Sequence, residues 1–173
     1  MKLTGREMLL AACAVGLAVS SVRGDAPVLR WNGGDGGVWD NASANWLDAG
    51  GQAAAWQPGA EARFDGAPGL VNVAEDVAAS NLTFATGGHV LLGAGVLTAH
   101  GALSCAAATT NSVAAALLTG GAVKTGPGAL ALARCVGPLS IQEGALLAAG
   151  SQFADADLAV AAGAALVTLG EPD

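Results

Sequence analysis

The fold is decided by the stretch Gly120-Gly121-Ala122-Val123-Lys124-Thr125-Gly126-Pro127-Gly128-Ala129-Leu130-Ala131-Leu132. Two short apolar segments in it are separated by glycine and proline. Residues 129–132 alternate Ala and Leu, and a period of two is the pattern of a β-strand rather than of a helix. Gly and Pro between such segments favour a turn. The stretch therefore predicts short strands joined by tight corners.

The same texture extends over residues 67–170. Leu82 and Phe84 alternate with smaller or polar neighbours, and residues 154–160 alternate in the same way. Recurrent glycines leave roughly 4–10 residues between turns, which suits strands and is short for helices. A helix over residues 102–119 is the alternative, because this segment lacks Gly and Pro and is rich in Ala. Residues 109–112 (Thr-Thr-Asn-Ser) in its middle favour a turn instead.

The composition favours a thin, stacked interior. Hydrophobic residues make up 53% and charged residues 12% of the chain, which excludes disorder, whereas aromatics are only 4% and Tyr is absent. Ala, Val and Leu suit the narrow core of stacked coils. We therefore expect an all-β fold, a parallel β-helix or β-solenoid over residues 67–173, with roughly five coils spaced by ~4.8 Å.

Residues 1–24 have the pattern of a signal peptide. Lys2 and Arg6 precede an apolar run that extends from Met8 to Val19. Such a run is too short to span a bilayer, which takes about 20 residues. We expect cleavage after Gly24, a secreted or cell-surface location, and no transmembrane segment in the mature chain.

The charge balance limits the partners. The formal net charge is −7; without residues 1–24, four basic residues remain against thirteen acids, a net of −9. A surface of this sign repels phosphate backbones and anionic lipid, so nucleic-acid binding is not expected. The partner itself is not identified by the sequence; a surface glycan and a protein both stay open.

Residues 25–66 differ from the rest because they contain all four tryptophans, Trp31, Trp39, Trp46 and Trp56. Solenoid ends expose strand edges and apolar core, so they need a cap. This segment is therefore predicted to be an N-terminal cap, and the alternative is a platform on which sugar rings stack.

Cys105 and Cys135 are the cysteines that remain after the leader. In an oxidising compartment they could form a disulfide that closes a loop of about thirty residues. The alternative is that both are buried thiols, which pack as small apolar groups. The sequence leaves both interpretations open.

No catalytic, metal or cofactor site is predicted. His89 and His100 lack companions at ligand spacing and are expected to be exposed. The acidic pairs Glu75-Asp76 and Asp155/Asp157 could serve a hydrolase, but they read as solvated side chains. The chain is therefore not expected to be an enzyme.

Two stretches resemble the autotransporter-associated β-strand repeat proteins. The first, residues 29–84, contains a Trp-Asn-Gly-Gly start, Trp39-Asp40, Asn45-Trp46 and Phe64-Asp65-Gly66; the second is the Gly-rich Lys-Thr-Gly-Pro-Gly stretch quoted above. The resemblance implies an exported β-helix passenger. The expected function is a non-catalytic surface, structural or adhesin-like module. The alternatives are a carbohydrate-binding module that uses the Trp-rich segment and a polysaccharide-cleaving β-helix enzyme.

Overall fold

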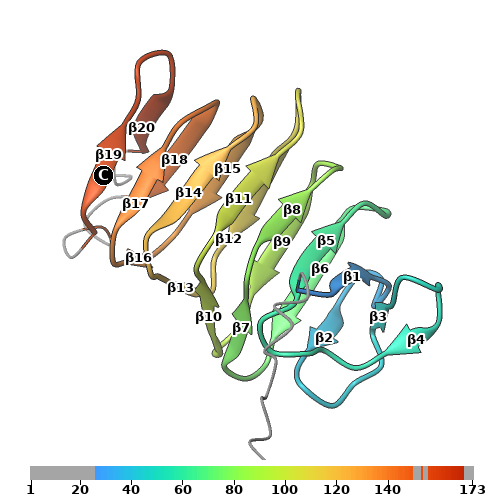
Figure 1. Cartoon of the computed structure of the whole chain (residues 1–173). Helices are drawn as coiled ribbons and strands as arrows, with labels where there is room; N and C mark the ends of the chain where they lie inside the picture. Colours follow the sequence, from blue (N-terminus) through green and yellow to red (C-terminus); the bar gives the residue numbers. More distant parts are fainter. Residues whose placement is uncertain (1–25, 150–152, 154–155, 170–173) are drawn as a thin grey trace, which may run out of the picture.

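Each short apolar segment of the sequence forms a β-strand, and successive strands meet at tight corners (Figure 1). The computed structural model describes residues 26–149, 153 and 156–169, which contain twenty strands and no α-helix. The proposed leader, residues 1–24, and Asp155 lie outside this range. Within it, no helix is long and apolar enough to cross a membrane. The expected all-β class is confirmed.

The strands form three sheets, whose strands pair in parallel except at β3 and β4. In order along the nine-stranded sheet, sheet A, the strands are β19 (Leu158–Val160), β17 (Leu139–Ile141), β14 (Ala122–Thr125), β11 (Ala102–Cys105), β8 (Leu82–Phe84), β5 (Glu61–Phe64), β1 (Val28–Trp31), β3 (Trp46–Leu47) and β4 (Ala53–Ala54).

The seven-stranded sheet, sheet B, contains β2 (Gly37–Trp39), β6 (Gly69–Val73), β9 (His89–Leu92), β12 (Thr110–Val113), β15 (Ala129–Leu132), β18 (Ala145–Ala149) and β20 (Ala165–Leu169). The four-stranded sheet, sheet C, contains β7 (Val77–Ala79), β10 (Val96–Ala99), β13 (Ala116–Thr119) and β16 (Cys135–Val136).

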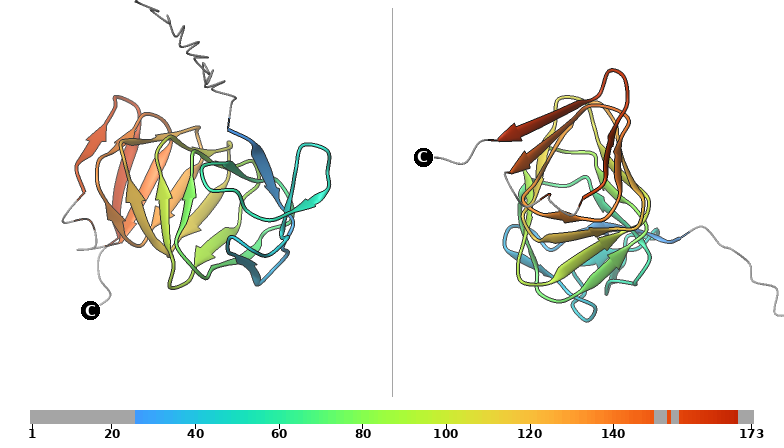
Figure 2. Two further views of the ribbon diagram at one scale, coloured as in Figure 1. Left: turned by 60° about the horizontal axis from the view of Figure 1, so that its bottom comes forward. Right: turned by 90° about the vertical axis from the view of Figure 1, so that its left-hand side faces the viewer.

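The chain visits the three sheets in turn and so winds into a solenoid of about five coils, as expected. Viewed along its axis, the coils lie over one another (Figure 2, right). Leu82 pairs with Leu103 and Leu103 pairs with Lys124, so these two coils have the same length. Lys124 pairs with Ile141, so the next coil is shorter. Corners of different length absorb this difference.

The alternative of a helix over residues 102–119 is wrong. The segment contains β11, β12 and β13, one strand for each sheet of a single coil. The turn expected at residues 109–112 also lies elsewhere, because Thr110–Val113 is strand β12. The corner precedes it and contains Ala108, whose φ of 56° places a non-glycine residue in the left-handed region.

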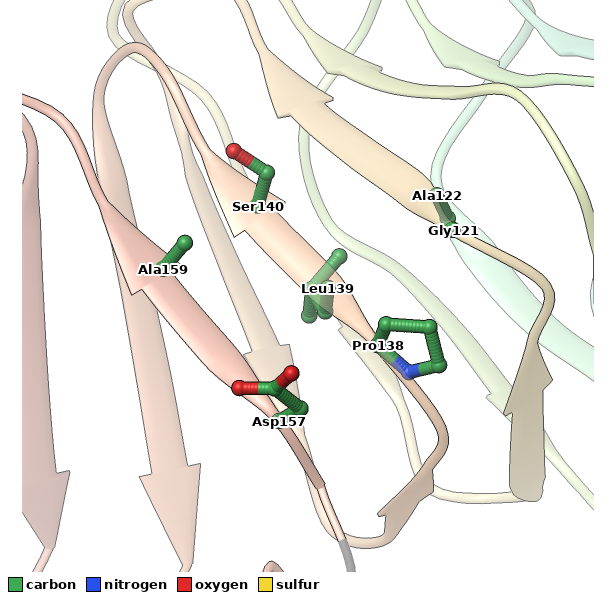
Figure 3. A pocket seen from close by; sticks show the side chains of 7 residues that line it. All are labelled: Gly121, Ala122, Pro138, Leu139, Ser140, Asp157 and Ala159. Carbon is green, nitrogen blue, oxygen red and sulfur yellow. The ribbon is translucent and has the colours of Figure 1, made fainter.

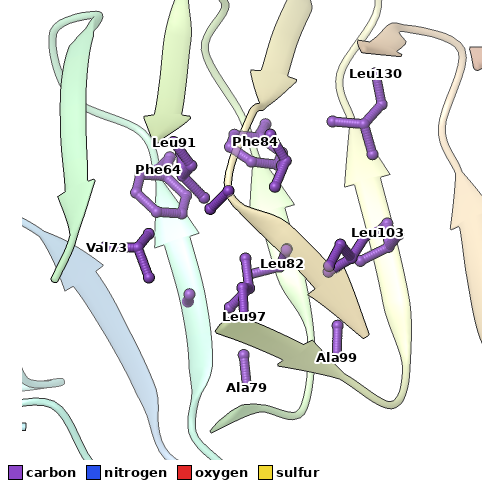
Figure 4. Packing of buried hydrophobic residues seen from close by; sticks show 14 of the residues in the cluster. Phe64, Val73, Ala79, Leu82, Phe84, Leu91, Leu97, Ala99, Leu103 and Leu130 are labelled. Carbon is purple, nitrogen blue, oxygen red and sulfur yellow. The ribbon is translucent and has the colours of Figure 1, made fainter. Parts of the chain in front are cut away.

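The core is a set of ladders in which the inward residue of each strand stacks on that of the next coil (Figure 4). Phe64 pairs with Phe84, and their rings stack with centroids 5.0 Å apart, which is close to the strand spacing. Ladders of Leu, Val and Ala line the other two walls of the interior. Apart from the aromatic residues near the N-terminal end, the core therefore consists mainly of Leu, Val and Ala, as the composition predicts.

Candidate functional site

The four tryptophans form one buried cluster at the N-terminal end. Trp39, Trp46 and Trp56 lie with ring centroids 4.7–4.9 Å apart, and Trp31 lies 5.1 Å from Trp46. Their exposed fractions are between 0 and 7%, and the cluster packs on Phe64 of the first complete coil. Such buried rings present no open face to a sugar, and the arrangement supports the cap interpretation.

Two short strands complete this cap. β3 pairs antiparallel with β1, and β4 pairs antiparallel with β3, so the parallel stacking of sheet A ends there. Carboxylates hold the cap loops: Asp40 accepts hydrogen bonds from the backbone of Ala42 and Ser43, and Asp48 from Gly50 and Gln52. These acids stabilise turns, since local carboxylate-to-backbone bonds are typical of Asx turns.

Cys105 and Cys135 are free, buried thiols in the structure. Cys105 belongs to β11 of sheet A and Cys135 to β16 of sheet C, so they lie on different walls of the solenoid. Burial raises the pKa of Cys105 to about 11 and also raises that of Cys135. The structure thus agrees with the packing alternative, and neither thiol is poised as a nucleophile.

The acidic pairs do not converge on one site within the described residues. The Glu75 carboxylate accepts hydrogen bonds from Asn41, and Asp76 Oδ1 accepts one from the backbone N of Val96, 2.9 Å away. Asp157 lies on another coil beside Pro138 and Leu139, at a surface cavity of about 140 Å³ (Figure 3). In the described part of the chain, no three His, Cys, Asp or Glu side chains gather as metal ligands do.

His89 contradicts the expectation that both histidines are exposed, whereas His100 is exposed. His89 is 1% exposed; its Nε2 lies 2.9 Å from Thr86 Oγ1, and its backbone N donates to Asn111 Oδ1 on the next coil. Desolvation by burial lowers the pKa of His89, so the ring is neutral near pH 7. It is part of the core and offers no exposed ligand.

Lys124 is a buried cation inside the solenoid. Lys124 lies in an inward ladder between two apolar residues, Leu103 and Ile141, and its side chain is fully buried. Burial lowers its pKa. Its Nζ donates to three backbone carbonyls, those of Thr125 and Gly126 in its own corner and of Glu143 in the next coil, at 2.7–3.1 Å. Because these acceptors use all three ammonium protons, Lys124 joins two corners and has no donor left for a ligand.

The outer faces of the sheets differ in polarity. One outward ladder of sheet A consists of Arg30, Arg63, Thr83, Ser104 and Thr125 in successive strands. The outward positions of sheet B between β6 and β18 have no charged side chain: Leu70, Asn72, Val90, Leu92, Thr110, Ser112, Ala129, Ala131, Ala145 and Leu147. Sheet A is therefore the polar face.

An arginine pair occupies the N-terminal end of that polar ladder. Arg30 and Arg63 are register partners on β1 and β5, and both donate through Nε to Asp65 Oδ2, at 3.0 and 3.1 Å. Partial burial raises the pKa of Asp65, but its contacts with the two guanidinium groups outweigh this effect and hold the pKa below the usual value. The sequence pattern did not predict this group, although both arginines occupy outward positions of their strands and such alternation is a usable signal.

A surface cavity of about 200 Å³ lies where these strands end. It is lined by Trp31 and Asn32, which follow Arg30, by Gly66 and Ala67, which follow Asp65, and by Gly34. The indole Nε1 of Trp31 donates to the Gly34 carbonyl at 3.3 Å, which fixes the ring beside the cavity. Comparisons with protein-family models, with curated proteins and with solved structures found no match to this chain.

Proposed function

We propose that the chain is an exported, non-catalytic surface module whose solenoid has a structural or adhesin-like role outside the cell. The main observation in its favour is that the interior groups capable of chemistry are used to hold coils together. Lys124 binds carbonyls of two corners, His89 and Asn111 connect neighbouring coils, and the thiols are buried. The outer faces of a rod built in this way remain available to contact other molecules.

The surface geometry also favours a non-catalytic role. The two cavities described above measure about 140 and 200 Å³, whereas small-molecule sites usually span ~300–1,000 Å³. The acids are spread over different coils, and several of them cap turns. A polysaccharide-cleaving enzyme needs two carboxylates at a common bond. Incubation with a polysaccharide panel should release no new chain ends; turnover that Asp157→Asn abolishes would contradict the proposal.

Export is supported by the leader pattern of residues 1–24 and by the resemblance to passenger proteins. The full chain, expressed in a bacterium with a general secretion system, should leave the cytoplasm and begin at Asp25, as read by N-terminal sequencing. Val15→Arg, which places a charge in the apolar run, should retain it in the cytoplasm with an intact leader. Leu70→Arg, at a position 45% exposed in the solenoid, is the matched control and should leave export unchanged. Retention of the unaltered chain with Met1 in place would refute export.

A further inference from the structure

Asn32 begins the loop that joins β1 to β2 in the cap. It is the only asparagine of the chain that is followed by a glycine, Gly33. The side-chain carbonyl carbon of an asparagine can be attacked by the backbone nitrogen of the next residue, which closes a succinimide ring. Glycine hinders this attack least, because it has no Cβ. The sequence therefore distinguishes Asn32 as the asparagine most exposed to loss of its amide group.

The fold leaves both reacting groups of this pair unengaged. The Asn32 side chain is exposed and, among the residues that the structure describes, makes no hydrogen bond; the backbone nitrogen of Gly33 donates none either. The loop is anchored through other atoms. The backbone nitrogen of Asn32 donates to the Asn45 carbonyl at 2.9 Å, and the indole of Trp31 donates to the Gly34 carbonyl at 3.3 Å. Neither bond uses the groups that would react.

Asn41 provides an internal comparison, because it is exposed in the same cap but both of its corresponding groups are engaged. Its side-chain amide donates to Glu75 Oε1 at 2.9 Å. The backbone nitrogen of the following residue, Ala42, donates to Asp40 Oδ1 at 3.0 Å. Ala42 also carries the Cβ that glycine lacks. Attack at Asn41 therefore requires two hydrogen bonds to break first.

Two aspartates that also precede glycines are held in a different way. Asp35 Oδ1 accepts a hydrogen bond from the backbone nitrogen of Leu70 at 2.8 Å, and the nitrogen of Gly36 donates to the Leu70 carbonyl at 2.9 Å. Asp65 is an anion beside the two arginines described above, and a carboxylate anion resists attack by a nucleophile. Asn32 thus combines a neutral amide with an unengaged neighbouring nitrogen.

We propose that Asn32 is a site of spontaneous deamidation and that its isoaspartyl product loosens the cap. The Gly33 nitrogen, after losing its proton to base, attacks Asn32 Cγ; the N–Cγ bond forms, the Cγ–Nδ2 bond breaks, and Nδ2 takes up a proton and leaves as ammonia. Water then opens the succinimide at either carbonyl and gives aspartate or isoaspartate. The reaction consumes only water. This inference goes beyond the proposed function, because it applies to the folded chain whether or not it is exported.

The cap has little room for the isoaspartyl product, in which the main chain runs through Cγ and gains one carbon before Gly33. A Cβ on Gly33 would lie 2.4 Å from a ring atom of Trp31, and a Cβ on Gly37 would lie 2.3 Å from the Gly33 carbonyl oxygen. Gly33 is therefore packed between the indole and the start of β2. Displacing it disturbs Trp31, whose ring packs on Trp46 with centroids 5.1 Å apart. The aspartyl product keeps the normal backbone and avoids this displacement.

The test is incubation of the full, folded chain in mildly alkaline buffer, followed by peptide mass spectrometry that distinguishes aspartate from isoaspartate. Asn32 should convert to both products at least about tenfold faster than Asn41. A parallel incubation in urea gives the rates in the unfolded chain. Equal rates at the two asparagines of the folded chain would overturn the proposal. So would an Asn32 that stays intact when folded but converts when unfolded, because the fold would then protect it.

Thermal unfolding tests the effect on the cap. The converted chain should have a midpoint at least about 3 °C below that of the fresh chain. Asn32→Gln is the matched control, since its longer side chain cannot close the same ring, and its midpoint should survive the same incubation. Freshly prepared Asn32→Asp adds the charge without the extra main-chain carbon, so it should unfold within about 2 °C of the unaltered chain. An equal loss in Asn32→Gln, an equally low midpoint in Asn32→Asp, or isoaspartate without any loss would overturn the link to the cap.

Discussion

Replacing Lys124 by Met tests whether the buried ammonium group stabilises the solenoid. The substitution keeps an unbranched side chain of similar length in the ladder between Leu103 and Ile141, but removes the ammonium group. Three backbone carbonyls then lose their donor, two in the corner of one coil and one in the next. The question is whether these hydrogen bonds outweigh the cost of burying the charge.

The magnitude follows from the contacts. A hydrogen bond to a charged group contributes roughly 1.5–3 kcal/mol, so three contribute roughly 5–9 kcal/mol. Desolvation of a buried ion costs several kcal/mol and offsets part of this sum. Water also reaches the corner in the variant, because Glu143 is exposed and Thr125 is only half-buried. We therefore expect Lys124→Met to lower the free energy of unfolding by about 2–4 kcal/mol.

Urea unfolding followed by far-UV circular dichroism measures this difference, provided that the slope with denaturant is unchanged. Leu103→Met is the matched control in the same ladder, one coil away, and should cost less than about 1.5 kcal/mol. A Lys124→Met variant as stable as the unaltered chain, or more stable, would refute the argument. The carbonyl contacts would then merely compensate for the buried charge.

Five further substitutions test separate parts of the fold. Burial lowers the pKa of His89 from 6.5, so the unfolded chain binds more protons than the folded chain. The free energy of unfolding should therefore fall as the pH drops below about 6.5. Urea titrations at several pH values measure this dependence, and His89→Leu should flatten it. Gly126→Ala should lower the free energy of unfolding by more than about 3 kcal/mol, because the new Cβ would lie 2.3 Å from a backbone carbonyl oxygen. Gly121 also has a positive φ but has open space around it, so Gly121→Ala should lower the free energy of unfolding by only about 1–2 kcal/mol. Similar losses in the two variants would contradict the clash at Gly126. Ala108→Gly should raise the thermal midpoint slightly by relieving a φ of 56°, and a clear decrease would argue against that conformation. Trp39→Ala should destabilise the chain by about 3–5 kcal/mol with loss of cap fluorescence, and a neutral result would contradict the cap.

The strands were predictable because their signal is local. Alternation at Leu82 and Phe84 and at residues 129–132 identifies β8 and β15, and glycines mark several of the corners. The prediction that the tryptophan-rich segment is a cap likewise comes from its composition and from its place before the first coil. These features require no knowledge of which coil lies next to which.

What could not be predicted depends on contacts between coils. Asn111 favours a turn in isolation, but its side chain bonds the backbone of His89 on the preceding coil, and the segment becomes a strand. His89 is buried because it occupies an inward position of β9 and packs beside Phe64 of the preceding coil. Arg30 and Arg63 are far apart in the sequence, and most of the cap lies between them. Since the coils differ in length, sequence spacing alone does not give these partners.

The central claim is that successive coils stack in parallel with the register found here. Thr83, Ser104 and Thr125 occupy one outward ladder, so adjacent partners lie about 4.8 Å apart and alternate ones about twice that distance. A disulfide cannot bridge Cα atoms more than about 7 Å apart. On oxidation, Thr83→Cys/Ser104→Cys should therefore form an intramolecular disulfide, detected by peptide mass spectrometry, and Thr83→Cys/Thr125→Cys should not. Failure of the first pair to cross-link, or equal cross-linking of both pairs, would contradict the solenoid.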